Sequence, residues 1–215
     1  AITVGRNGSN INGNATDDSV ERNGALHYVY SSSATIGWAK VNRDSTESFI
    51  AATGGTTTTS GNYKIHAFNS SSNFVVSSVS ATAVENEVSY LVVAGGGSGG
   101  QQVGPEKGTG GGGAGGYRES KSANDTYTTN ATANSTDITV SAQTYPITVG
   151  AGGAVNNSSP SSADRGGNSV FSTITSTGGG GGGNDQGSAL PGGSGGGILR
   201  NTIGNGNTPP VSPPQ

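Results

Sequence analysis

The chain has 215 residues, of which 40 are Gly, more than twice the share of roughly 7% found in ordinary proteins. Leu, Ile, Val and Phe together supply 35 residues, too few for the large apolar core of a globular protein of this length. The formal net charge of −3 is too small for a chain kept unfolded by its charge. Its sign also argues against nucleic acid as a partner, because phosphates require a basic surface.

Several other classes of protein are excluded. The chain has no Cys, so it has neither a disulfide framework nor a thiolate metal site. No run of apolar residues approaches the roughly 18 that span a membrane. Because the chain starts at Ala1 and contains no Met, we expect a processed chain or a fragment of a longer protein.

Residues 1–43 contain short alternating runs separated by Asn-Gly pairs, which predicts a small β-module. We expect a tight turn at Asn7-Gly8, because both residues tolerate the positive φ that two-residue hairpins require. The runs 26–30 and 36–41 are predicted to pair as strands, with Trp38 as a core plug. A unit of this size buries little apolar surface, so we expect copies of the unit to stabilise one another.

Residues 44–60 are rich in Thr, Ser and Gly, a composition typical of a linker. The remaining residues, 61–215, are predicted to form one domain of strands that lead into glycine-rich segments. Strands are expected where β-branched and aromatic residues gather, at 63–68, 73–77, 88–94, 145–149 and 169–174. No helical pattern with caps occurs anywhere, so the sequence predicts an all-β fold without α-helix.

The glycine residues of the second half gather in tracts, at 95–100, 108–116, 150–153, 178–183 and 192–197. Sequence of this kind is usually a flexible linker. Here the tracts lie beside apolar or aromatic residues, which favours packed, extended left-handed helices with three residues per turn. Because Gly has no side chain, such polyglycine II helices can lie close together and hydrogen bond through their backbones. We therefore expect small β-modules followed by a glycine-rich sandwich of polyglycine II-type helices.

The sequence contains patterns typical of catalysis or cofactor binding, but the neighbouring residues lack the elements that such sites require. Residues 95–100 match the dinucleotide pattern G-x-G-x-x-G, but the residues that follow cannot form the helix that such a site requires. His27 and His66 are the only histidines, and two ligands without a carboxylate cluster are too few for a metal site. We expect no catalytic, cofactor-binding or metal-binding residues, no cofactor and no enzymatic activity.

The order of motifs resembles proteins of bacteriophage tail fibres. Residues 3–11, followed by 26–30 and Gly37-Trp38, are similar to small β-modules of such fibres. Residues of about 60–215 resemble the glycine-rich domain of phage fibre proteins. Its motifs occur in order at 63–68, 90–97, 110–118, 145–153, 169–172, 178–183 and 207–215.

The resemblance implies a structural and adhesive virion protein, exposed outside the cell on a tail fibre. Its implied partners are a host-surface glycan or outer-membrane protein, other phage tail proteins and further copies of the chain in a homotrimer. In distal tail-fibre adhesins with such tracts, polyglycine helices form a sandwich and the variable segments between them touch the host. Carried over, these loops are 101–107, 117–143, 154–165, 184–191 and 198–207.

The longest loop, 117–143, is our first choice for receptor recognition, with a merely solvated loop as the alternative. The residues expected to contact the receptor are polar, charged or aromatic: Tyr117, Arg118, Asn124, Asp125, Tyr127, Asn130, Asn156, Asn157, Asp164, Arg165, Asn184, Asp185 and Gln186.

Other functions fit the same composition. A subunit of a cell-surface or extracellular filament is one, and an ice-binding polyglycine protein is another. Ice binding predicts short, uniform connections, whereas the inserts here run from about 7 to about 27 residues. This difference in length favours the adhesive function.

Overall fold

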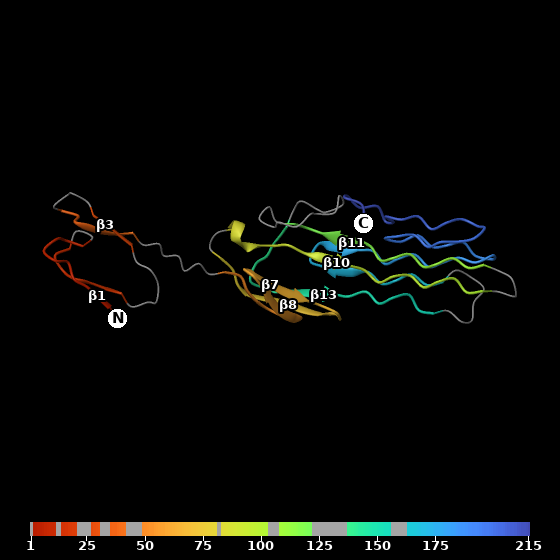
Figure 1. Ribbon diagram of the computed structural model, residues 1–215, viewed down its shortest axis with the longest axis horizontal. Helices are drawn as coiled ribbons and strands as arrows, with labels where there is room; N and C mark the ends of the chain where they lie inside the picture. The colour runs from red at the N-terminus through yellow and green to blue at the C-terminus, as the bar shows by residue number, and fades with distance from the viewer. Residues whose placement is uncertain are drawn as a thin grey trace. The chain divides into compact units, whose positions relative to one another are not determined.

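The computed structural model describes residues 2–11, 14–20, 27–30, 35–41, 49–80, 83–102, 108–121, 137–155 and 163–215. The chain divides into two compact units, Ala1–Ser48 and Phe49–Gln215, which are described separately (Figure 1). The described residues form strands and extended segments, with a single turn of 3-10 helix, η1 (Ala83–Asn86), and no α-helix. The predicted all-β class is confirmed. In the described part of the chain, no helix has the length and apolar character needed to span a membrane.

The first unit is built from two antiparallel pairs of short strands. β1 (Ile2–Val4) pairs with β2 (Asp18–Val20), and β3 (His27–Tyr30) pairs with β4 (Trp38–Val41). The tight turn expected at Asn7 and Gly8 is confirmed, since their φ angles are 43° and 84°. The backbone N–H of Ser9 closes this turn on the oxygen of Arg6, at 2.9 Å.

Trp38 is less buried in the first unit than expected for a residue that plugs its core. Its side chain is 38% exposed and rests against Tyr30, with 5.0 Å between the ring centroids, while Tyr30 is 56% exposed. Ile11, bridged to Trp38, is the buried apolar residue among those described in this unit. The unit therefore presents an aromatic pair to solvent.

The second unit contains a five-stranded antiparallel sheet in the order β15-β14-β13-β8-β5. Its strands are β5 (Ala51–Thr53), β8 (Ser72–Ser78), β13 (Thr144–Thr148), β14 (Ser169–Phe171) and β15 (Ile174–Ser176). Smaller antiparallel pairs accompany it: β6 (Thr56–Ser60) with β7 (Tyr63–Ala67), β9 (Glu87–Val88) with β12 (Ile138–Thr139), and β10 (Leu91–Val93) with β11 (Tyr117–Glu119).

The predicted linker over residues 44–60 differs from the structure. Residues 51–53 and 56–60 are strands, and the second unit begins at Phe49. Thr is a β-branched residue that favours strands. The run from Thr56 to Thr59 therefore pairs with β7 although its polarity is typical of a linker.

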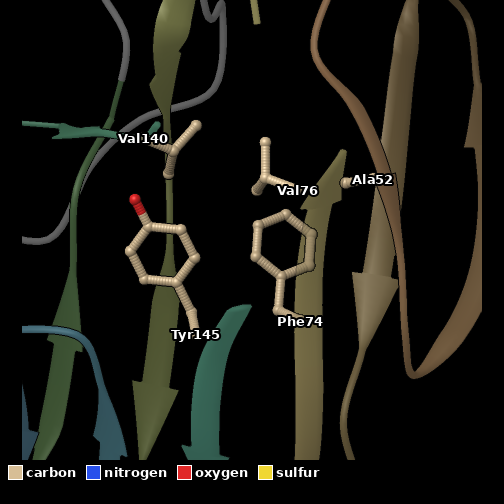
Figure 2. Packing of buried hydrophobic residues seen from close by; sticks show 5 residues of the cluster. All are labelled: Ala52, Phe74, Val76, Val140 and Tyr145. Atoms are coloured by element: carbon tan, nitrogen blue, oxygen red, sulfur yellow. The ribbon is translucent and has the colours of Figure 1, made fainter. Parts of the chain in front are cut away.

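A small aromatic core holds the sheet. Phe74 is 7% exposed and contacts the rings of His66, Phe68, Tyr145 and Phe171 at centroid distances of 5.2 to 6.4 Å. Figure 2 shows Phe74 and Tyr145 together with the smaller members of the cluster, Ala52, Val76 and Val140. The ring contact to His66 anchors the β6–β7 hairpin to the sheet.

The strands lead directly into closely packed glycine segments, which we call the glycine bundle. They run side by side away from the sheets (Figure 1) and comprise residues 94–102, 108–116, 150–155, 163–168, 177–183, 189–198 and 203–208. Residues 178–184 are buried along their whole length. The centre of the bundle is therefore almost entirely backbone.

Hydrogen bonds in the bundle recur at every third residue. The N–H groups of Gly179 and Gly182 donate to the oxygens of Gly95 and Ser98. On another side, the oxygens of residues 177, 180 and 183 accept from the N–H groups of residues 116, 113 and 110. A period of three is that of the polyglycine II helix, in which each third residue faces the same neighbour. The predicted packed helices are present, and the flexible-linker alternative is not.

The bundle needs Gly for space and not for unusual backbone angles. A Cβ on Gly181 would lie 1.8 Å from the oxygen of Ala163, and one on Gly178 would lie 1.8 Å from that of Gly166. The left-handed φ values among described glycines belong to residues 8, 37, 54, 55 and 61, all outside the bundle. On the surface the constraint disappears, because a Cβ on Gly111 would meet nothing within 4 Å.

Candidate functional site

Several turns of the glycine bundle gather at the end remote from the strands, whereas the chain reverses at 191–194 near the strand end, where the Gly193 N–H donates to the oxygen of Gly178. The chain leaves β10 along residues 94–102 and returns along 108–116 to β11, and it leaves β15 along 177–183 before turning at 184–188. Because each of these excursions begins at a strand, its turn lies at the far end (Figure 1). We call the described residues there the tip: 101–102, 108–109, 184–188 and 198–203.

Asn184 joins the segments of the tip. Its side chain, 1% exposed, donates from Nδ2 to the oxygen of Gln101 at 3.1 Å. Its Oδ1 accepts from the N–H groups of Gln186 and Gly187, at 2.9 and 2.8 Å. A bridge to Thr109 adds the second glycine segment. The predicted contact residue Asn184 is therefore an internal support, which orders the turn around it.

Asn201 ties the last segment to the same turn. Its Nδ2 donates to the backbone oxygens of Asn184 and Asp185, at 3.2 and 3.3 Å. The backbone N–H of Ala189 donates to the oxygen of Thr202, which fixes the end of this segment. Turns separated by many residues in sequence thus form one continuous surface.

The tip surface combines polar, charged and apolar side chains. Gln186 and Arg200 are exposed, and Asp185 is half-buried. Leu199 and Ile203 are 59% and 65% exposed. These polar and charged groups can hydrogen bond to a partner, and the two exposed apolar side chains offer it contact area.

The longest predicted loop emerges at the opposite end of the bundle. Tyr117 and Arg118 belong to strand β11, where they pair with Val93 and Val92 beside the sheets, and both are half-buried. The Tyr117 hydroxyl donates to a carboxylate oxygen of Glu119. The structure does not bring these two predicted residues together with the tip.

Asp164 and Arg165 lie along the side of the bundle. The backbone of Asp164 exchanges hydrogen bonds with Ser98, whose Oγ accepts from the Asp164 N–H at 3.0 Å, while both the Asp164 and Arg165 side chains are exposed. Arg165 Nε donates to the oxygen of Pro191 at 2.8 Å. The other predicted contact residues lie outside the described residues: Asn124, Asp125, Tyr127, Asn130, Asn156 and Asn157.

Sequence reasoning missed Gln101, Asn201 and the two exposed apolar residues of the tip. The available signal was the short run Ile198-Leu199, which stands out in a segment otherwise rich in Asn, Gly and Thr. In the described parts of the chain, no group of three or more His, Cys, Asp or Glu residues is placed to hold a metal ion.

Comparison with protein families matches most of the second unit. Residues 70–210 match the glycine-rich domain family, which covers more than half of the chain, and the chain belongs to this family. Comparison with curated proteins finds no match, and neither does comparison with solved structures.

Proposed function

We propose that this chain is an adhesive part of a bacteriophage tail fibre and that its tip binds a receptor on the host surface. The observation that carries the proposal is that the turns at 184–188 and 198–203 meet the ends of the 94–102 and 108–116 segments in one tip, away from the strands. The resemblance of the motif order to phage fibre proteins supplies the biological setting.

The packing of the tip favours binding without large rearrangement. Its turns rest on backbone segments that hydrogen bond to one another, and Asn184 and Asn201 hold the turns together. A surface that is ordered before binding loses little conformational entropy when the partner arrives, which raises affinity. The exposed turn residues, unlike Asn184 and Asn201, can also differ without disturbing the buried glycine backbone.

The partner that suits this surface is a glycan or an outer-membrane protein of the host. Exposed Gln186 and Arg200 offer hydrogen bonds, while Leu199 and Ile203 offer apolar contact. The proposed role is binding alone, without enzymatic activity. In the virion, the chain would assemble as a homotrimer with other tail proteins and act outside the cell.

Binding of the fluorescently labelled full chain to a panel of bacterial strains tests the proposal. We expect strain-specific binding that falls at least about tenfold when Gln186 and Arg200 are both changed to Ala, because both side chains are at the tip surface. The matched control replaces residues 122–136 by a short Gly-Ser linker and should retain binding.

Each alternative outcome has a definite meaning. Loss of binding in the linker variant alone would move recognition to the strand end of the bundle. Absence of binding to every strain, by a chain shown to be folded, would contradict the adhesive function.

A further inference from the structure

A groove lies along the side of the glycine bundle, away from the tip. It has a volume of about 340 Å³ and is lined by Arg165, Asn168, Thr177, Pro191, Thr208 and Pro209. These residues come from segments far apart in sequence. The volume is at the lower end of the range of roughly 300–1,000 Å³ for small-molecule pockets, which suits a ligand the size of one sugar ring.

The guanidinium group of Arg165 in this groove is held in place by a hydrogen bond from one of its nitrogens. Arg165 Nε donates to the backbone oxygen of Pro191 at 2.8 Å. Among the described residues, no partner is found for its terminal Nη groups. A guanidinium anchored in this way presents a planar pair of N–H donors, which matches the two oxygens of a carboxylate.

Asn168 adds a second donor. Its Oδ1 accepts the backbone N–H of Gly178 at 2.9 Å, which fixes the orientation of the amide. The Nδ2 group is therefore left as a donor. A donor that is held in this way suits a hydroxyl or carboxylate oxygen of a ligand.

The remaining lining provides apolar walls and acceptors. Pro191 and Pro209 carry no N–H donor, and their rings can pack against the C–H face of a sugar. Thr208 donates its hydroxyl to the oxygen of Gly206 at 3.2 Å, so its oxygen is left to accept. None of the described residues that line the groove carries a carboxylate, and Arg165 presents a positive charge to a ligand.

We propose that this groove binds a sugar residue that carries a carboxylate, such as a uronic acid. Arg165 holds the carboxylate through two parallel hydrogen bonds, and Asn168 donates to a ring hydroxyl. The two prolines pack against the ring. The site is separate from the tip and does not depend on the receptor-binding role proposed above.

Titration of the full chain by isothermal calorimetry tests the groove with three probes: methyl glucuronide, methyl glucoside and inorganic phosphate. We expect glucuronide to bind at least about tenfold more tightly than glucoside, because a charge-assisted pair is lost without the carboxylate. Phosphate, which lacks the ring, should bind more weakly than glucuronide.

Two substitutions connect the binding to the groove. Arg165→Gln should weaken glucuronide binding at least about tenfold, and Arg165→Lys should fail to restore it fully because Lys lacks the planar fork. Lys64→Gln, which changes an exposed cation on strand β7, outside the groove and the tip, should bind like the original chain. Thermal unfolding of each variant confirms that it is folded.

The results that overturn the proposal are clear. Glucoside binding as tight as glucuronide binding would remove the role of the carboxylate. Phosphate binding as tight as glucuronide binding would make the groove a simple anion site and end the sugar assignment. Unchanged binding in Arg165→Gln, or no binding of glucuronide, would overturn the site itself.

Discussion

Asn184 Nδ2 donates a hydrogen bond to the backbone oxygen of Gln101, a residue 83 positions earlier in the chain. The bond crosses between two turns of the glycine bundle at a point where Asn184 is 1% exposed. A side chain that satisfies backbone groups of two turns contributes more to the stability of the fold than to binding of a partner.

The first prediction concerns this side chain. Asn184→Ala removes three side-chain hydrogen bonds from a buried position, so we expect the free energy of unfolding to fall by about 3 kcal/mol. Chemical denaturation measures the change. Gln186→Ala, an exposed neighbour in the same turn, is the control and should change stability by less than about 0.5 kcal/mol. Equal effects of the two substitutions would contradict the role of Asn184.

The second prediction tests whether the bundle requires Gly for space. A Cβ on Gly181 would collide with the oxygen of Ala163, whereas a Cβ on Gly111 would meet open space. Gly181→Ala should destabilise the chain by at least about 3 kcal/mol. Gly111→Ala should be neutral or stabilise by up to about 1 kcal/mol, because it restricts the unfolded chain. Thermal and denaturant unfolding compare the pair, and similar melting temperatures would refute the backbone-packed interior.

The third prediction concerns the aromatic core. Phe74 contacts four other rings and is 7% exposed, so Phe74→Ala should cost about 3–5 kcal/mol of unfolding free energy. Tyr63 is 52% exposed, and Tyr63→Ala should cost less than about 0.5 kcal/mol. Urea denaturation followed by circular dichroism provides both values. A small loss for Phe74→Ala would show that the glycine bundle is stable without the sheet core.

The fourth prediction follows from the exposed pair Tyr30 and Trp38. If the first unit is shared in the proposed homotrimer, light scattering should give a mass of about 63 kDa, three times 21.0 kDa. The chain has a single Trp, so its fluorescence reports on this position alone. We expect blue-shifted emission that moves to the red on dilution, because Trp38 leaves a buried contact.

Substitution separates this contact from other sources of association. Trp38→Ser should lower the mass toward 21.0 kDa, while Phe49→Ser, which changes an apolar residue that is 69% exposed in the second unit, should leave the mass unchanged. A mass of 21.0 kDa for the original chain at high concentration would contradict the homotrimer.

Sequence patterns were sufficient for elements whose chemistry is local. The turn at Asn7 and Gly8 follows from the positive φ that both residues tolerate, and the strands around Phe74 and Tyr145 follow from β-branched and aromatic residues. The glycine helices follow from tracts that lie beside apolar or aromatic residues, an arrangement that favours packed helices over a flexible linker. The strands within 51–60 were missed because polar Thr runs occur both in linkers and in strands.

The sequence could not predict that turns far apart in the chain meet at the tip. Which glycine segment neighbours which depends on packing in three dimensions, and tracts of nearly identical sequence carry no information about it. For the same reason, Asn184 could not be distinguished from an exposed residue such as Gln186. Their different burial is set by Gln101 and Thr109, which lie far away in sequence.

The period of three in the bundle also limits how its segments can change in length. Inserting one residue into 178–183 would rotate everything beyond it by about 120° and direct every following N–H to the wrong neighbour. Inserting three residues would add one full turn, so that each following N–H group would still face the same neighbouring segment. Gene duplication or slippage in units of nine nucleotides could therefore lengthen such segments and carry the turns farther from the sheets, while other length changes would have to be confined to the turns.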